Sequence, residues 1–172
     1  FIERINRAGF LPDEDLERVE ELAKRTFTDE SGTVSPWITE EERRRLSIRK
    51  GTLTAEEREI IQSHAAVTQR ILSHISFPAS FADVPMWAGA HHEQLNGHGY
   101  PAQLPAEQIP MEVRLLTILD VFEALTAKDR PYKKPFPPEK ALAILHNMVE
   151  EGAVDKDLLS LFEQSGAWAK AP

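Results

Sequence analysis

The chain has 172 residues, 41% of them hydrophobic, and 20 Lys and Arg against 28 Asp and Glu, which gives a formal net charge of -8 at pH 7. This length suits one domain with a real core, and the acidic balance argues against a general binder of nucleic acid or of anionic membranes. Because there is no cysteine, disulfide scaffolds and thiolate metal sites are excluded.

No apolar run approaches the roughly 20 residues that span a bilayer, and no signal-peptide pattern opens the chain. The chain begins at Phe1 rather than Met, so we expect a piece that was processed, trimmed or cut from something larger. A cytoplasmic, soluble fragment is the expectation that follows.

Apolar residues recur at helical spacing along the chain, and no segment shows the period-two alternation of a strand. Thr39 is a candidate N-cap, and Thr54 with Glu57 three residues later forms a capping box. Polar loops are expected at 28–36 and 94–110. The expected helices cover about 13–26, 39–46, 54–75, 84–93, 111–127, 138–150 and 155–164. The sequence therefore predicts an all-α fold.

Two of these helices place ionisable groups where burial is expected. In the helix that starts at Thr54, a step of 100° per residue puts His64 in the middle of an apolar arc of roughly 80° that faces the core. The arc also contains Ile60, Val67, Ile71 and Ile75. Asp120 lies in a helix that is apolar on nearly every side, which predicts burial on most sides.

A shared metal site would explain both placements together with the pair His91 and His92 at the end of another helix. Neutral imidazole and carboxylate are standard ligands for iron, manganese and zinc where no thiol is available. Each residue also has a simpler interpretation, because His64 alone suits a hydrogen-bonded core histidine. Asp120 alone could cap a helix or pair with Arg114 or Arg130. The zincin motif is absent, since Asn96 stands where its second histidine is required.

A local basic cluster follows the helix that carries Asp120. Between residues 127 and 135 four cationic side chains stand against one acid; the cations are Lys128, Arg130, Lys133 and Lys134. Such a cluster can hold phosphate, with a bidentate contact from arginine and a point charge from lysine. A solvated loop is the alternative for the cluster taken alone.

The string HHEQLNGHGYP at 91–101 resembles HHExxDGxGYP, the signature of the HD-GYP family of HD-superfamily phosphohydrolases. The segments 49–64 and 104–134 resemble the family's neighbouring motifs in order and spacing, and the resemblance covers about residues 49–165. We therefore expect 49–172 to be the C-terminal part of an HD-GYP-like domain. Residues 1–48 resemble an N-terminal helical insertion or extension, whose amphipathic helix packs on the core or forms a homodimer.

The resemblance implies an all-α HD-superfamily helical bundle that binds two or three divalent metals, usually iron or manganese, and hydrolyses cyclic di-GMP. By motif match, the metal ligands are His64, His91, His92 and Asp120. Arg130 and Lys133 match basic positions that contact substrate phosphate. The loop residues Gly99, Tyr100 and Pro101 shape the site and are linked to recognition of a partner such as a diguanylate cyclase domain.

Two departures from the family pattern are visible. Asn96 replaces the usual aspartate of the motif, and the His-Asp doublet that names the superfamily is absent, because every histidine lies at or after position 64. We expect the doublet to lie on a preceding segment, so that the 172 residues alone hold metal weakly and show little phosphodiesterase activity. The alternatives are a degenerate, non-catalytic binding module, or an enzyme acting on another nucleotide or phosphoester.

Overall fold

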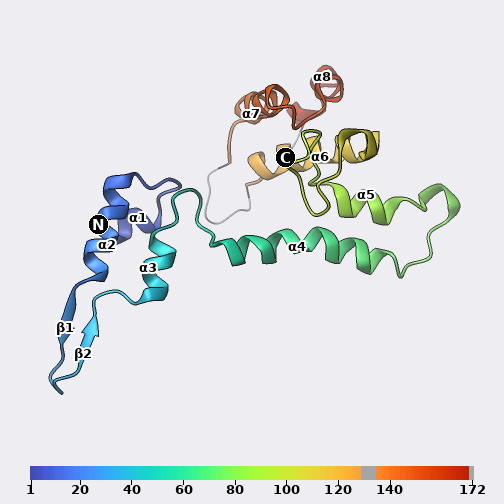
Figure 1. Ribbon diagram of the computed structural model, residues 1–172. Helices are drawn as coiled ribbons and strands as arrows, with labels where there is room; N and C mark the ends of the chain where they lie inside the picture. Colours follow the sequence, from blue (N-terminus) through green and yellow to red (C-terminus); the bar gives the residue numbers. More distant parts are fainter. Residues whose placement is uncertain (129–134, 171–172) are drawn as a thin grey trace. The chain divides into compact units, whose positions relative to one another are not determined.

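The computed structural model describes residues 1–128 and 135–170 (Figure 1). Over these ranges the chain forms eight α-helices and one two-stranded sheet. The helices are α1 (Ile2–Asn6), α2 (Asp13–Ala23), α3 (Glu40–Leu46), α4 (Ala55–Leu72), α5 (Val84–Ala90), α6 (Met111–Thr126), α7 (Pro138–Glu150) and α8 (Lys156–Gln164). Short 3-10 turns lie at Ala79–Phe81, Ala106–Gln108 and Ala167–Lys170. The predicted all-α class is confirmed.

The chain divides into two compact units, Phe1–Ile61 and Gln62–Pro172. The division falls within α4, at a different position from the predicted boundary between residues 48 and 49. That predicted boundary marks where similarity to the family motifs begins, and it stays a prediction. Among the described residues, every helix falls short of the length and apolar character that a bilayer crossing requires.

In the first unit, a small core of Ile5, Leu11 and Val19 holds the helices together. The N-cap predicted at Thr39 and the capping box predicted at Thr54 and Glu57 are confirmed, and Thr39 forms a full capping box with Glu42. The Glu42 amide donates to Thr39 Oγ1 at 3.2 Å, and the Thr39 amide donates to the Glu42 carboxylate at 2.7 Å. The Thr54 amide likewise donates to the Glu57 carboxylate at 2.9 Å.

The prediction of a loop at 28–36 is wrong in part, because the ends of this segment belong to a β-hairpin. Strand β1 (Thr26–Thr28) pairs antiparallel with β2 (Val34–Pro36), and α2 ends earlier than expected. The Asp29 carboxylate closes the turn by accepting hydrogen bonds from the amides of Ser31 and Thr33, at 2.8 and 2.9 Å. Strands of three residues are too short for an alternating pattern to be visible in the sequence.

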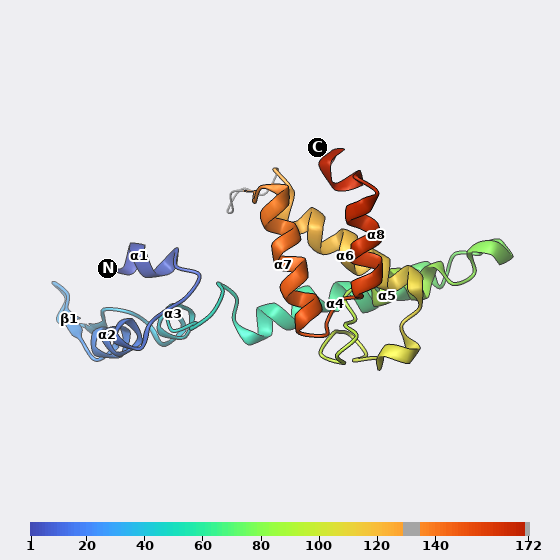
Figure 2. The same cartoon turned by 90° about the horizontal axis from the view of Figure 1, so that it is seen from above.

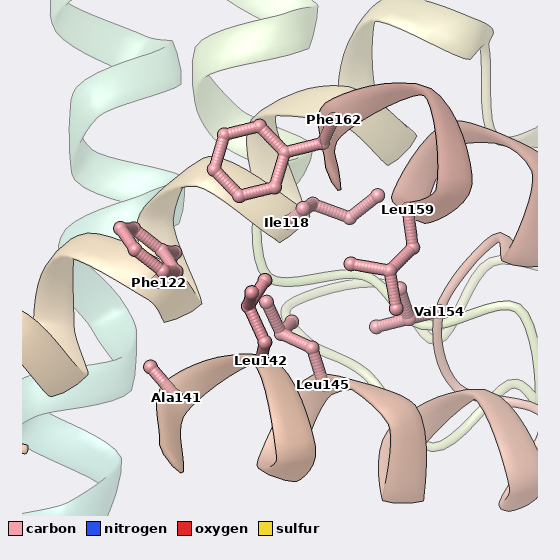
Figure 3. Packing of buried hydrophobic residues seen from close by; sticks show 8 residues of the cluster. All are labelled: Ile118, Phe122, Ala141, Leu142, Leu145, Val154, Leu159 and Phe162. Carbon is pink, nitrogen blue, oxygen red and sulfur yellow. The ribbon is translucent and has the colours of Figure 1, made fainter. Parts of the chain in front are cut away.

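In the second unit, α6, α7 and α8 lie side by side and share one core (Figure 2). Ile118 and Phe122 of α6 meet Leu142 and Leu145 of α7, and Figure 3 shows these side chains pointing toward one another. The Phe122 ring meets the Phe162 ring of α8 edge to face, with 5.2 Å between centroids. A second cluster, formed by Ala90, Ile109 and Val113, joins α5 to α6.

The predicted burial of the apolar face of α4 is wrong. In the described structure Ile71 is 60% exposed, Ile75 is 51% exposed, and His64 is exposed as well. Ala65 is the buried residue of this helix. On α6, Leu115, Leu116 and Leu119 also remain more than a third exposed, so that helix is not buried on most sides. The helical spacing of these residues is real, but the described part of the chain has no element that covers them.

Candidate metal centre

Three histidine rings from two parts of the second unit meet at one point. His64 extends from the middle of α4, whereas His91 and His92 directly follow α5. The Nε2 atom of His64 lies 3.1 Å from Nε2 of His92 and 3.5 Å from Nε2 of His91. Each of the three residues offers a ligand atom, and these atoms all lie within 4.8 Å of one another.

The orientation of His91 is set by its other ring nitrogen. Nδ1 of His91 lies 2.7 Å from the carbonyl oxygen of Ala88, so it donates its proton there and leaves a lone pair on Nε2. Thr117 of α6 donates to the carbonyl oxygens of His91 and Val113, at 2.9 and 3.0 Å, and ties this turn to α6. Such hydrogen bonds to the outer nitrogen and backbone are typical of metal-ligating histidines.

The donor set fits a divalent cation. Imidazole nitrogens about 2.1 Å from a common ion lie ~3.0–3.4 Å apart in octahedral or tetrahedral arrangements. The Nε2 atom of His64 lies 3.1 Å from that of His92, within this range, and 3.5 Å from that of His91, just above it. The His cluster can therefore hold a divalent metal ion.

Asp120 lies beside the cluster, on the far side of one ring. Its Oδ2 atom is 3.6 Å from Nδ1 of His92, the nitrogen that does not face the other histidines. The side chain of Asp120 is 40% exposed, so the full burial that the sequence predicts for this carboxylate is wrong. Pairing with Arg114 is not observed, because Arg114 binds Asp155 at 3.1 Å and two backbone carbonyl oxygens of the 106–109 turn.

The surroundings of His92 disfavour positive charge on its ring. Burial, together with the neighbouring rings of His91 and His64, lowers the pKa of His92 from its ordinary 6.5 to about 4, while Asp120 acts in the opposite direction. Burial and then Asp120 raise the pKa of Tyr100. At neutral pH His92 is therefore a neutral imidazole, which is the form that ligates metals.

This pKa shift predicts the pH dependence of stability of the metal-free chain. Between pH 6.5 and about 4 the unfolded His92 binds a proton that the folded residue refuses. Folding stability therefore rises with pH in this window. We expect the urea midpoint to fall as the pH is lowered from 7 to 4, and the fall to be smaller in His92→Gln. An equal pH dependence in the two proteins would contradict this assignment.

The loop after the histidines is held by a buried carboxylate. Glu93 is 2% exposed, and its two oxygens accept hydrogen bonds from the amides of Ala102 and Leu104, at 2.7 and 2.9 Å. Glu93 is not among the site residues expected from the sequence. The signal for its role was available, since a loop rich in glycine and proline supplies amides that need an acceptor.

Tyr100 and Pro101 are brought to the edge of the cluster by this loop. The Tyr100 amide donates to the His92 carbonyl oxygen at 3.2 Å, and the two rings lie 4.6 Å apart between centroids. The Tyr100–Pro101 peptide bond is cis. Asn96, which departs from the family pattern, donates from Nδ2 to the carbonyl oxygen of Glu151 at 3.2 Å, a bond that an aspartate could not donate.

Gly99 has no room for a side chain. A Cβ atom there would lie 2.4 Å from the amide nitrogen of Gln94 and 2.5 Å from Cα of Glu93, and both are backbone atoms. We expect Gly99→Ala to lower the free energy of unfolding by about 2–3 kcal/mol through overpacking. Urea denaturation measures the loss, with Gly9→Ala as control, because a Cβ at Gly9 meets nothing within 4 Å. Equal midpoints for the two variants would contradict this reason for a glycine.

Arg130 and Lys133, the predicted phosphate contacts, lie outside the described residues, as does most of the basic cluster at 127–135. Their positions relative to the histidines therefore stay a prediction. The structure brings together His64, His91 and His92, places Asp120 against His92, and places Tyr100 against the same ring.

The family model of the HD domain matches residues 41–158, which is more than half of the chain. The chain belongs to the HD domain family. It is 36% identical over 115 residues to the 3'3'-cGAMP-specific phosphodiesterase 3 of Vibrio cholerae, across 67% of this chain and 24% of the relative.

Two further relatives are named for a different cyclic dinucleotide. A cyclic di-GMP phosphodiesterase of Thermotoga maritima is 35% identical over 104 residues, across 60% of this chain and 28% of that protein. The cyclic di-GMP phosphodiesterase response regulator RpfG of Xanthomonas campestris is 36% identical over 100 residues, across 58% and 26%. The chain spans about a quarter of the length of these curated relatives.

Proposed function

We propose that this chain carries a large part of the catalytic centre of a metal-dependent phosphodiesterase of the HD-GYP type, and that its substrate is cyclic di-GMP. The observation that carries the proposal is the convergence of three imidazoles, with their Nε2 atoms in contact, beside the Asp120 carboxylate. Relatives named as cyclic dinucleotide phosphodiesterases support the reaction class.

In this proposal the ligands are His64, His91, His92 and Asp120, and the ion is iron or manganese, as imidazole and carboxylate donors without thiolate allow. When bound, the ion supplies Lewis-acid polarisation of the phosphate and lowers the pKa of a coordinated water. The residues of the chain orient this centre. Ala88 fixes the ring of His91, and Tyr100 covers one face of His92. Arg130 and Lys133 neutralise the charge that develops on the phosphate.

The test measures hydrolysis by the complete encoded protein that contains these residues, after loading with Mn(II) or Fe(II). Cyclic di-GMP, 3'3'-cGAMP and a simple phosphodiester such as bis-p-nitrophenyl phosphate are compared as substrates. We expect His91→Ala to abolish turnover of cyclic di-GMP, and His146→Ala, which alters a histidine bonded to Glu163, to retain it. Full activity of His91→Ala would refute the assigned centre, and preference for another substrate would refute cyclic di-GMP.

A second candidate is a non-catalytic module that binds a partner, such as a diguanylate cyclase domain, through the loop at Gly99, Tyr100 and Pro101. One sequence feature favours it, namely Asn96 in place of the aspartate of the signature. A complete protein that lacks hydrolytic activity with either metal, yet binds a purified cyclase domain, would support this candidate. Tyr100→Ala should then weaken the complex.

A further inference from the structure

Residues 40–59, which form α3 and the start of α4 (Figure 1), carry six basic and six acidic side chains. Four arginines there have carboxylate partners: Arg43 with Glu20 and Glu40, Arg44 with Glu56, Arg45 with Glu41 and Glu57, and Arg49 with Asp13. Lys50 and Arg58 have no ion pair among the residues that the structure describes. In a chain of net charge -8, two cations without a counter-charge on one small surface require an explanation.

Both of these cations line one pocket. The pocket has a volume of about 400 Å³, and four cationic side chains stand in its wall against the single acid Glu56. The four are Arg44, Arg49, Lys50 and Arg58. The volume falls within the ~300–1,000 Å³ that is usual for small-molecule sites. The hollow is open to solvent, and its volume is enough to seat a small phosphorylated group against its basic wall.

The wall that carries Lys50 is held by backbone hydrogen bonds. The Gly51 amide donates to the Gly9 carbonyl oxygen, and the Leu11 amide donates to the Arg49 carbonyl oxygen, both at 2.9 Å. Gly51 has a φ of +87°, and a Cβ there would lie 3.7 Å from Nη2 of Arg58. The guanidinium of Arg58 thus lies near the backbone of Gly51, and Lys50, the preceding residue, lines the same pocket.

The remaining walls give the pocket a mixed character. Ile48 and Leu53 add apolar side chains, and Thr54 and Ala55 bring in the N-terminal end of the 18-residue helix α4. The partial positive charge of a long helix at its N-terminus acts in the same direction as the cations. Arginine and lysine together with an apolar patch suit a phosphorylated organic molecule better than a bare carboxylate, because the fork of arginine matches phosphate and the patch takes an organic group.

We propose that this pocket, formed by residues 44–58, is a binding site for a small phosphorylated ligand that carries at least two negative charges. The site shares no residue with the histidine cluster, and the proposal stands apart from the proposed hydrolytic function. A ligand here would bind to the segment that leads into α4, the helix that carries His64.

The experiment uses inorganic pyrophosphate as the probe and isothermal titration calorimetry as the measurement, on the full 172-residue chain after passage over a chelating resin. Binding with one pyrophosphate per chain is expected. Lys50→Gln together with Arg58→Gln should weaken it at least tenfold. The matched control removes two charges elsewhere in the first unit, with Arg7→Gln and Lys24→Gln, and should stay within twofold of the wild-type chain. No binding, or equal weakening in both double variants, would overturn the proposal.

The basic cluster at 127–135 is the competing site for pyrophosphate, and the variant Arg130→Gln with Lys133→Gln addresses it. Binding that is lost in this variant and retained in Lys50→Gln with Arg58→Gln would overturn the pocket assignment and leave the proposed phosphodiesterase function intact. The Gly51 amide resonance provides a readout that needs no variant, because Gly51 follows Lys50 directly and its Cα lies near the guanidinium of Arg58. Pyrophosphate should shift this resonance, and an unmoved resonance at saturation would also refute the site.

Discussion

Replacing His92 with alanine is expected to reduce the affinity of the chain for Mn(II) by about 100-fold or more, since loss of a residue that merely supports a ligand already costs 10–100-fold. His92 faces His64 through Nε2 at 3.1 Å and Asp120 through Nδ1 at 3.6 Å. One substitution therefore removes a donor and separates the carboxylate from the other two rings. Electron paramagnetic resonance of free Mn(II), titrated to millimolar ion, measures the loss.

The matched control for this experiment is His146→Ala, because His146 lies on α7 and hydrogen-bonds to Glu163 at 2.8 Å. It should leave Mn(II) affinity unchanged. If His92→Ala and wild type bind Mn(II) equally, the ring cluster is a set of hydrogen-bonded neutral histidines, which is the simpler interpretation that the sequence left open for His64. If only His64→Ala and His91→Ala weaken binding, His92 is excluded as a ligand.

Removing the Glu93 side chain should have the largest effect on stability. Glu93→Ala removes two part-buried hydrogen bonds from a charged acceptor to the amides of Ala102 and Leu104, at about 1.5–3 kcal/mol each, and it opens a cavity at a residue that is 2% exposed. We expect the free energy of unfolding to fall by about 3–5 kcal/mol, measured by urea denaturation. Glu93→Gln retains one carbonyl acceptor, so its free energy of unfolding should lie between those of Glu93→Ala and the wild-type chain.

The same variants separate two roles for Glu93. Its oxygens are occupied by the amides of the loop, so its effect on metal binding should act through the position of Tyr100 and the rings, and should be smaller than that of His92→Ala. A Glu93→Ala chain of wild-type stability with lost Mn(II) affinity would instead make Glu93 a ligand. A loss of stability below 1 kcal/mol would refute its role as the anchor of the loop.

The helical spacing of apolar residues and the capping residues predicted most helices correctly, because helix formation depends on residues close together in the sequence. The Thr39 and Thr54 boxes start α3 and α4 through hydrogen bonds between residues three apart. The short hairpin at 26–36 was missed since three-residue strands carry too little pattern, and its turn depends on one side chain, Asp29.

The convergence of the histidines was predicted from residue chemistry and from the HD-GYP resemblance, and the distances agree with it. The detailed arrangement could not be predicted. Whether Asp120 faces the shared centre or the outer nitrogen of His92 depends on how α6 packs against the turn after α5, which no spacing within α6 encodes. The ion pair of Arg114 with Asp155 could not be predicted either, because the two residues are 41 positions apart in the sequence and meet only in the folded chain.

The sequence by itself determined the helical class, the starts of the helices, and which polar residues are chemically suited to a metal, because these depend on neighbours within a few positions. Only the tertiary structure decided which faces are buried. The apolar side of α4 stays exposed at Ile60 and Ile71, whereas the carboxylate of Glu93 is enclosed. Periodicity shows that a helix has an apolar side, but that side is buried only if a distant segment packs against it. The carboxylate of Glu93 is buried because the amides of Ala102 and Leu104 meet it, and this contact exists only in the folded chain.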